Sequence, residues 1–254
     1  MHVQIEGEGP PLVLIHSLLT DAAAFDDVAS SMAQKRCVVR VSLPGFAGTP
    51  PLEGDDLTIA DLAEAVAEAM DAADLGPDTA VLGNGLGSFV ALSLAVQHGE
   101  RFGPLIAANS GATFPDERKG AFTNMSGAVA DGGMGAVVDV AVKRIFPEPF
   151  ANAHPNMVDE RREVIMRTEP HAFAAACRAL RELDLRPDLG AITNPTLVIA
   201  GGADATTPPE MSDDLVAGIP GAEFSMLDGC GHCPQLEQPS EFVREIEAFL
   251  DRVA

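Results

Sequence analysis

Short apolar runs alternating with helix-like segments constrain the fold of this chain more than any other feature. The strand-like runs span residues 11–17, 37–43, 79–84, 104–109, 195–201 and 222–228. The first, third, fourth and fifth are apolar nearly throughout, as strands buried on both faces of a parallel sheet should be. Helical periodicity separates the runs, at Asp21–Ala33, Ile59–Ala73, Leu86–His98, Glu210–Ala217 and Pro239–Val253. This alternation predicts an α/β fold with a doubly wound, mostly parallel sheet.

The alternation is interrupted between Gly111 and Pro195, where the sequence has mostly helical character. A helical insertion after a central strand can cover the carboxyl edge of the sheet, where ligands of α/β proteins bind. We therefore expect a single domain over residues 1–254 that contains a helical cap at residues 112–190.

The charge balance excludes several classes of partner. A formal net charge of −22 would repel nucleic acid and anionic membranes. No stretch approaches the ~18 apolar residues that span a bilayer. The N-terminal residues show no basic flank followed by a long apolar run, so we expect no signal peptide and a cytoplasmic location. A small molecule is the expected partner, no cofactor is implied, and the oligomeric state stays open.

Residues Val81–Phe89 read VLGNGLGSF, a strand that turns sharply into a helix. In the Gly-x-Ser-x-Gly elbow, the middle residue is a nucleophilic serine held in a strained turn. Gly85 stands at that middle position here. Gly83 and Gly87 fit the pattern, because they remove side chains that would clash with the neighbouring strand and helix.

Two further residues complete a chain order typical of hydrolases. Asp204 follows one strand-like run and His232 follows the last one. In a parallel sheet, this chain order brings the nucleophile position, the acid and the histidine together at one edge. The N–H of Leu86, together with that of Leu18 in the first loop, is predicted to bind a developing oxyanion.

Four cysteines raise a different possibility. Cys230-Gly231-His232-Cys233 matches the disulfide-exchange motif of thioredoxin-like oxidoreductases, but it lies near the C-terminus rather than after an early strand. The sequence shows no second pair of ligands at zinc spacing, so we predict no metal site. His232 is therefore assigned to the hydrolase-like constellation.

Over its whole length the sequence resembles the α/β-hydrolase superfamily, and within it the 3-oxoadipate enol-lactonases and related carboxylic ester hydrolases. The segment HSLLTDAAAFDDV is similar to their Ser-Leu-Gly-Thr-Asp loop, with Leu19 where glycine is usual. The segments SLPGFAGTP, NPTLVIAGGADATTPPEM and GHCPQLEQPSEF are similar to their turn, acid and histidine segments. Their Arg-Trp-Phe cap segment reads Arg144-Ile145-Phe146 here. The resemblance implies hydrolysis of a small lactone or carboxylic ester, with Arg144 and Ile145 at the substrate.

Gly85 leaves the mechanism open between three interpretations. A serine was replaced by engineering; or the glycine is natural and His232 activates a water; or the chain is a non-enzymatic, ligand-binding pseudoenzyme. The elbow is equally similar to that of carbon–carbon bond hydrolases that act on ring-cleavage products. Ser88 is a poor substitute for the nucleophile, because it lies three residues further on and about 300° around the helix axis.

The latent triad generates a first prediction. The Gly85→Ser variant should react with a fluorophosphonate at position 85, because acid, base and oxyanion donors remain in the sequence. Mass spectrometry of the labelled peptide checks this. A folded variant that binds ligand but takes no label at position 85 would argue against a latent serine triad.

Overall fold

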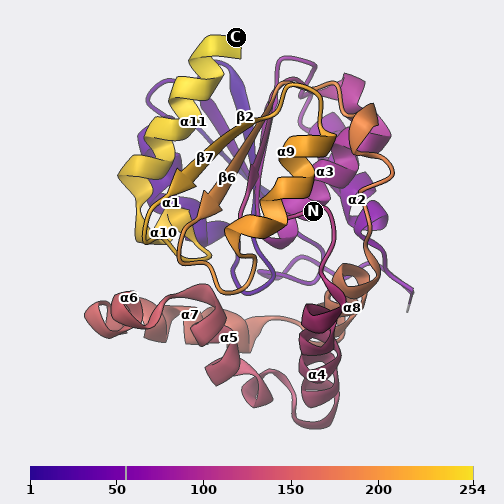
Figure 1. Ribbon diagram of the computed structural model, residues 1–254, viewed down its shortest axis with the longest axis vertical. Coiled ribbons are helices and arrows are strands. Elements are labelled where there is room, and N and C mark those ends of the chain that lie inside the picture. The colour runs from indigo at the N-terminus through magenta and orange to yellow at the C-terminus, as the bar shows by residue number, and fades with distance from the viewer. Residues whose placement is uncertain (55, 254) are drawn as a thin grey trace.

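The strand-like runs pair into one seven-stranded sheet (Figure 1). The computed structural model describes residues 1–54 and 56–253. The strands are β1 (His2–Glu6), β2 (Pro11–Ile15), β3 (Cys37–Ser42), β4 (Ala80–Asn84), β5 (Leu105–Ala108), β6 (Thr196–Gly201) and β7 (Glu223–Leu227). Their order is β1-β3-β2-β4-β5-β6-β7. All neighbouring strands are parallel except β1, which runs antiparallel to β3. The predicted mostly parallel sheet is confirmed.

β1 is the strand that the sequence pattern does not reveal. It lies at the edge of the sheet, and its side chains are exposed or half-buried. Ile5 is 58% exposed, and only Val3 packs against the core. An edge strand with so little burial has no continuous apolar run, and it pairs through its backbone instead.

Helices fill the connections between the strands. They are α1 (Asp26–Met32), α2 (Ile59–Ala72), α3 (Leu86–His98), α4 (Asp116–Gly132), α5 (Val138–Ile145), α6 (Glu148–Ala153), α7 (Pro155–Arg167), α8 (Pro170–Glu182), α9 (Asp213–Gly218), α10 (Pro234–Glu237) and α11 (Pro239–Val253). The predicted helices Leu86–His98 and Pro239–Val253 form with the expected bounds. Helices α4–α8 lie between Gly111 and Pro195, where mostly helical character was predicted.

The helix ends reflect local chemistry. At the start of α2, Thr58 and Asp61 form a reciprocal capping box, in which each side chain accepts the backbone N–H of the other. The predicted helix Asp21–Ala33 instead begins as a 3-10 turn at Ala22–Phe25 before α1 starts. The expected amphipathic elements therefore form, with tighter turns at some ends.

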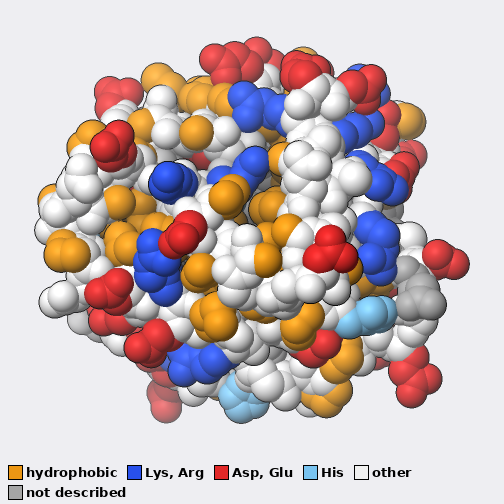
Figure 2. All heavy atoms as spheres, turned by 90° about the horizontal axis from the view of Figure 1, so that it is seen from below, with side chains coloured by type: hydrophobic (Ala, Val, Ile, Leu, Met, Phe, Trp, Pro, Cys, Tyr) orange, Lys and Arg blue, Asp and Glu red, His pale blue; other side chains and the backbone are white. Residues whose placement is uncertain are grey.

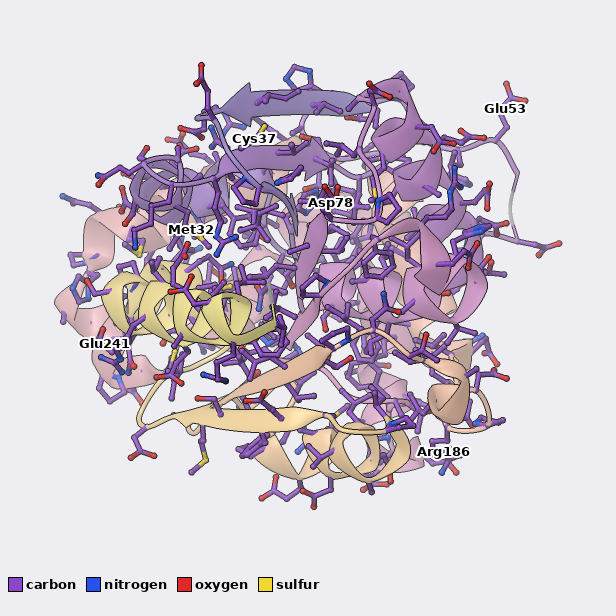
Figure 3. The ribbon with its side chains drawn as sticks, turned by 90° about the horizontal axis from the view of Figure 1, so that it is seen from above. Met32, Cys37, Glu53, Asp78, Arg186 and Glu241 are labelled. Carbon is purple, nitrogen blue, oxygen red and sulfur yellow. The ribbon has the colours of Figure 1, made fainter. Side chains whose placement is uncertain are left out.

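The two faces of the sheet belong to two hydrophobic cores. In β2, Val13 and Ile15 pack into the core beneath α2 and α3, whereas Leu12 and Leu14 pack into the core beneath α1 and α11. This alternation explains why the central strands are apolar at every position. Seen from above (Figure 3), α1 and α11 lie on one side of the sheet and α2 and α3 on the other.

Close packing at the elbow depends on glycine. A β-carbon on Gly87 would lie 2.1 Å from the backbone oxygen of Ile15 in β2. A β-carbon on Gly83 would lie 2.1 Å from the backbone oxygen of Gly87. Both distances are far below van der Waals contact, so α3 approaches the sheet this closely only because these residues lack side chains.

Helices α4–α8 lie between β5 and β6 in the chain and beneath one end of the sheet (Figure 1). They begin after Pro115 and end at Glu182, within the expected insertion at residues 112–190. We call α4–α8 the cap helices. Among the described residues, no helix is long and apolar enough to cross a membrane.

Candidate active site

Gly85 forms the elbow between β4 and α3. Its backbone has φ +55° and ψ −119°, a conformation that side chains rarely adopt. Its N–H donates to the carbonyl of Ala108 in the neighbouring strand at 3.0 Å, and its own carbonyl accepts from Ser88 N–H at 2.9 Å. The structure therefore places Gly85 in the strained turn that the sequence pattern predicts.

His232 and Asp204 meet beside this elbow. Nδ1 of His232 lies 2.8 Å from Oδ2 of Asp204, and both side chains are buried. Because the carboxylate accepts a hydrogen bond, we assign the proton of the imidazole to Nδ1. Nε2 is then free to accept a proton, which is the arrangement of a general base oriented by an acid.

The carboxylate of Asp204 is fully used as an acceptor. Oδ1 accepts from the N–H groups of Thr206 and Thr207 at 2.7 and 3.1 Å. Oδ2 accepts from the Thr207 hydroxyl and from Nδ2 of Asn109, at 2.6 and 2.8 Å, besides His232. Burial alone would raise the pKa of Asp204, but the nearby His232 and these hydrogen bonds lower it to about 2. The acid therefore stays ionised and fixes the imidazole.

The backbone of His232 is held from two sides. Its N–H donates to the carbonyl of Ile145 at 3.2 Å, and its carbonyl accepts from Nδ2 of Asn84 at 2.9 Å. Asn84 directly precedes the elbow glycine, and Ile145 ends cap helix α5. The histidine loop is thus positioned jointly by the sheet and by the cap.

The loop after β2 carries the predicted oxyanion donor Leu18. His16 fixes this loop: its Nδ1–H donates to the Ser17 carbonyl at 2.9 Å, and its Nε2 accepts the N–H of Leu43 at 3.1 Å. Burial lowers the pKa of His16, which agrees with a neutral ring. In the described part of the chain, neither Leu18 N–H nor Leu86 N–H takes part in a loop or cap hydrogen bond. Their role as oxyanion donors stays a prediction.

Ser17 is the residue that sequence reasoning missed. Its Oγ lies 3.2 Å from Nε2 of His232, and it is buried. A β-carbon on Gly85 would lie only 2.3 Å from this Oγ and 2.7 Å from Nε2 of His232. The available signal was its place directly after a strand-like run that points to the same edge of the sheet as the elbow.

A small cavity of about 30 Å3 joins these groups. Its lining includes Ser17, Leu18, Leu19, Gly85, Leu86, Phe89, Phe114, Phe122, Met125, Arg144, Leu180, Thr206, Thr207 and His232. The predicted elbow, base and oxyanion residues therefore surround one space, and Asp204 stands behind His232. Ile145 does not line this space: its side chain is buried in the core, and only its carbonyl reaches the histidine loop.

Arg144 brings a cation to this cavity. Its Nε is buried and, among the described residues, has no hydrogen-bond partner. Burial lowers the pKa of Arg144, and the positive charge of nearby Arg118 lowers it further. Its backbone carbonyl accepts from the Thr206 hydroxyl at 2.9 Å, which ties the end of α5 to the acid loop.

Comparison with known proteins agrees with this geometry. Residues 12–245 match the model of a family described as the alpha/beta hydrolase family. The chain belongs to the alpha/beta hydrolase family. The predicted membership and fold class are confirmed.

The relatives of this hydrolase-family chain include enzymes of two activities. It is 27% identical to 3-oxoadipate enol-lactonase 1 of Acinetobacter baylyi, over 100% of this chain and 94% of that protein. It is 29% identical to a pimeloyl-[acyl-carrier protein] methyl ester esterase of Aeromonas hydrophila, over 98% of this chain and 100% of that protein. The crystal structure of the enol-lactonase from Burkholderia xenovorans LB400 superposes with a TM-score of 0.93 at 25% identity, covering 98% of this chain and 96% of that one.

Three other candidate nucleophiles of this family member, Ser88, Cys230 and Cys233, form no hydrogen bond with the His232 ring. The Ser88 hydroxyl is buried and lies 2.7 Å from the Ser110 hydroxyl. Cys230 and Cys233 are buried free thiols, and burial raises the pKa of each. Low thiolate content makes a thiol a poor nucleophile, so neither cysteine has the environment of a reactive one.

The short distances around Gly85 generate a second prediction. Gly85→Ser should lower the free energy of unfolding by roughly 1–3 kcal/mol, because the new side chain overpacks against Ser17 and His232. Ser17→Gly should destabilise the wild-type chain but stabilise the Gly85→Ser variant, because it removes the closest obstacle. Urea unfolding of the four proteins measures this coupling. Strictly additive effects would contradict it.

The lowered pKa of Asp204 generates a third prediction. Because its folded-state pKa of about 2 lies below the unfolded value of 3.8, ionised Asp204 stabilises the fold above about pH 4. This contribution, on the order of 2 kcal/mol, is lost as the pH falls through about 2. The stability difference between wild type and Asp204→Asn should therefore shrink over that range.

Urea unfolding between pH 2 and pH 6 measures that difference. Asp74→Asn provides the matched control, since Asp74 is exposed and its positive φ of 54° suits asparagine as well. A wild-type advantage over Asp204→Asn that stays constant down to pH 2 would show that the carboxylate is not stabilised in its ionised form.

Proposed function

We propose that the protein hydrolyses a small carboxylic ester or lactone that carries a carboxylate, as the name of the similar 3-oxoadipate enol-lactonases suggests. His232, oriented by Asp204, acts as the general base. The N–H groups of Leu18 and Leu86 stabilise the oxyanion that forms when the carbonyl is attacked. Gly85 occupies the nucleophile position of the fold and supplies no side chain to the reaction.

The position of Arg144 at the cavity is the observation that best supports this proposal. Within the part of the chain that the structure describes, it is the one arginine or lysine that lines the cavity of His232. Its buried Nε is unpartnered, and an unpaired donor of this kind costs free energy unless a ligand accepts from it. A guanidinium binds a carboxylate with two parallel hydrogen bonds, so a carboxylated substrate would satisfy it.

The cap carries little of the net negative charge of the protein. The net charge is −22, yet residues 112–190 contain ten of the 16 lysine and arginine residues and only 12 of the 38 acidic residues. Figure 2 shows the cap side of the molecule, where basic side chains are spread among acidic and apolar ones. This nearly balanced charge means that an anionic substrate meets less repulsion at the cap than at the rest of the surface.

The apolar lining supports a small substrate. Phe122 and Met125 of α4 and Leu180 of α8 close the cavity from the cap side. A space of about 30 Å3 holds one or two water molecules but no six-carbon ring. Substrate entry therefore requires these cap side chains to move, which excludes water from the reacting carbonyl once they close again.

The role of Arg144 generates a fourth prediction. Arg144→Ala should weaken binding of a carboxylated lactone by about ten- to a hundredfold, because one charge-assisted pair contributes on the order of 1.5–3 kcal/mol. The methyl ester of the same carboxylate should be affected far less. KM values and dissociation constants for both ligands measure the difference.

Two further variants make this test specific. Lys143→Ala removes the same charge from the neighbouring, exposed position and should change binding of the carboxylated ligand little. His232→Ala should abolish turnover of both ligands while the protein still binds them. Equal weakening of both ligands by Arg144→Ala would leave Arg144 with only a supporting role in the cap. A protein that binds them without any turnover would instead be a ligand-binding member of the family.

A further inference from the structure

The hydroxyl of Ser17 stands where the side chain of the elbow residue would lie. Ser17 Oγ is 2.3 Å from the position of a β-carbon on Gly85, so a side chain at position 85 would require this hydroxyl to move from its present position. The same hydroxyl lies 3.2 Å from Nε2 of His232. The hydroxyl beside the base therefore occupies space that a side chain at position 85 would need.

The proton positions fit a nucleophile paired with its base. Nδ1 of His232 donates to Asp204, which leaves Nε2 as an acceptor. The O–H of Ser17 then donates to Nε2. This is the order of hydrogen bonds in a serine triad, from hydroxyl to imidazole to carboxylate, assembled with a serine from a different loop.

The backbone of Ser17 is fixed independently of this contact. Its N–H donates to the hydroxyl of Thr20 at 3.1 Å, and its carbonyl accepts from the Thr20 N–H at 3.2 Å. Its carbonyl also accepts from His16 Nδ1. A side chain on so rigid a turn is held in place before substrate arrives, which lowers the entropic cost of reaching the attack geometry.

The residue after Ser17 supplies a further part of the machinery. Leu18 follows Ser17 in the chain and lines the same cavity. In hydrolases with the elbow arrangement, the residue after the nucleophile donates its N–H to the oxyanion. Ser17 and Leu18 would repeat that relation, and Leu86, the first residue of α3, lines the same cavity with an N–H that has no partner within its helix.

We propose that Ser17 is the catalytic nucleophile of this protein, an inference that rests on the hydrolysis proposed above. His232 Nε2 takes the proton of the Ser17 hydroxyl while Oγ forms a bond to the carbonyl carbon of the ester or lactone. The resulting oxyanion collapses, the bond from the carbonyl carbon to the alkoxy or enol oxygen breaks, and that oxygen takes the proton from His232. An acyl group then remains on Ser17.

The second half of the reaction restores the enzyme. His232 takes a proton from a water molecule, and the water oxygen attacks the acyl carbon. The bond between Ser17 Oγ and that carbon breaks, and Oγ recovers its proton from His232. The carboxylic acid product leaves, and no group beyond water and substrate is consumed.

Covalent labelling of the wild-type chain tests the proposal directly. A short-chain alkyl fluorophosphonate should form an adduct on Ser17. Trypsin separates this serine, on the peptide of residues 1–35, from the elbow and Ser88, on the peptide of residues 41–101. Fragmentation of the first peptide should place the adduct at position 17, and His232→Ala should abolish the adduct.

Kinetics provide the second readout. Ser17→Ala should lower kcat by about 10³-fold or more, since loss of the nucleophile of a serine hydrolase costs up to ~10⁶-fold. Ser17→Gly should do the same, and circular dichroism with urea unfolding shows whether each variant folds. Ser88→Ala is the matched control: it removes a buried hydroxyl near the elbow and should keep both the adduct and the turnover.

The outcomes separate this inference from the proposed function. Absence of an adduct on Ser17 in active wild-type protein overturns the nucleophile. Turnover that survives Ser17→Ala within tenfold but is lost in His232→Ala also overturns it, and leaves a hydrolase in which the base activates water. An adduct on Ser17 in a protein that turns over no carboxylated ester or lactone supports the nucleophile and rejects the substrate class.

Discussion

The buried hydrogen bond between Asp204 and His232 is the interaction on which the site depends. An ionised carboxylate inside the protein is tolerated only when its oxygens are satisfied, and five donors converge on this one. Asn109 comes from the end of β5, and Thr206 and Thr207 come from the loop after β6. Ile145 of the cap and Asn84, which precedes the elbow, form hydrogen bonds with the backbone of His232. Strands, loops and cap thus share the task of orienting one imidazole.

The Ser17 hydroxyl lies beside this imidazole, in space that a side chain at position 85 would need. The strained elbow is retained at Gly85, together with the close approach of α3 to β2 at Gly87. The elbow carries no nucleophilic side chain in this protein, so its geometry does not serve a nucleophile at position 85. This geometry places Leu86, the proposed oxyanion donor, at the cavity and leaves room for the Ser17 hydroxyl beside the base.

Charge is distributed so that the site differs from the surface around it. The protein carries a formal net charge of −22, and an anionic ligand is repelled by most of its surface. The half-buried guanidinium of Arg144 lies in a cavity whose other walls are largely apolar. In such surroundings a single charge interacts more strongly with a carboxylate than it would in water. Under the proposed function, this combination would favour small anionic ligands over neutral ones of the same size.

The sequence alone predicted strands β2–β7, the central helices and the chain order of the candidate catalytic positions. Strands buried on both faces must be apolar at every residue, and a turn as tight as that at Gly85 needs glycines at fixed spacing, so both leave local patterns. The exposed edge strand β1 left no such pattern, because its pairing relies on backbone groups that every residue carries. Arg144 was singled out by resemblance, whereas Ile145 was expected at the substrate and lies in the core.

Only the tertiary structure decided that Ser17 approaches His232, two residues that are 215 positions apart in the chain. A serine in a loop carries no local mark of its partner, since the hydroxyl forms its hydrogen bond through contacts that folding creates. The space that admits it depends on an absent side chain at Gly85, in a third segment of the sequence. Local patterns reveal periodic burial and backbone conformation, but which side chain fills a shared space is determined by packing.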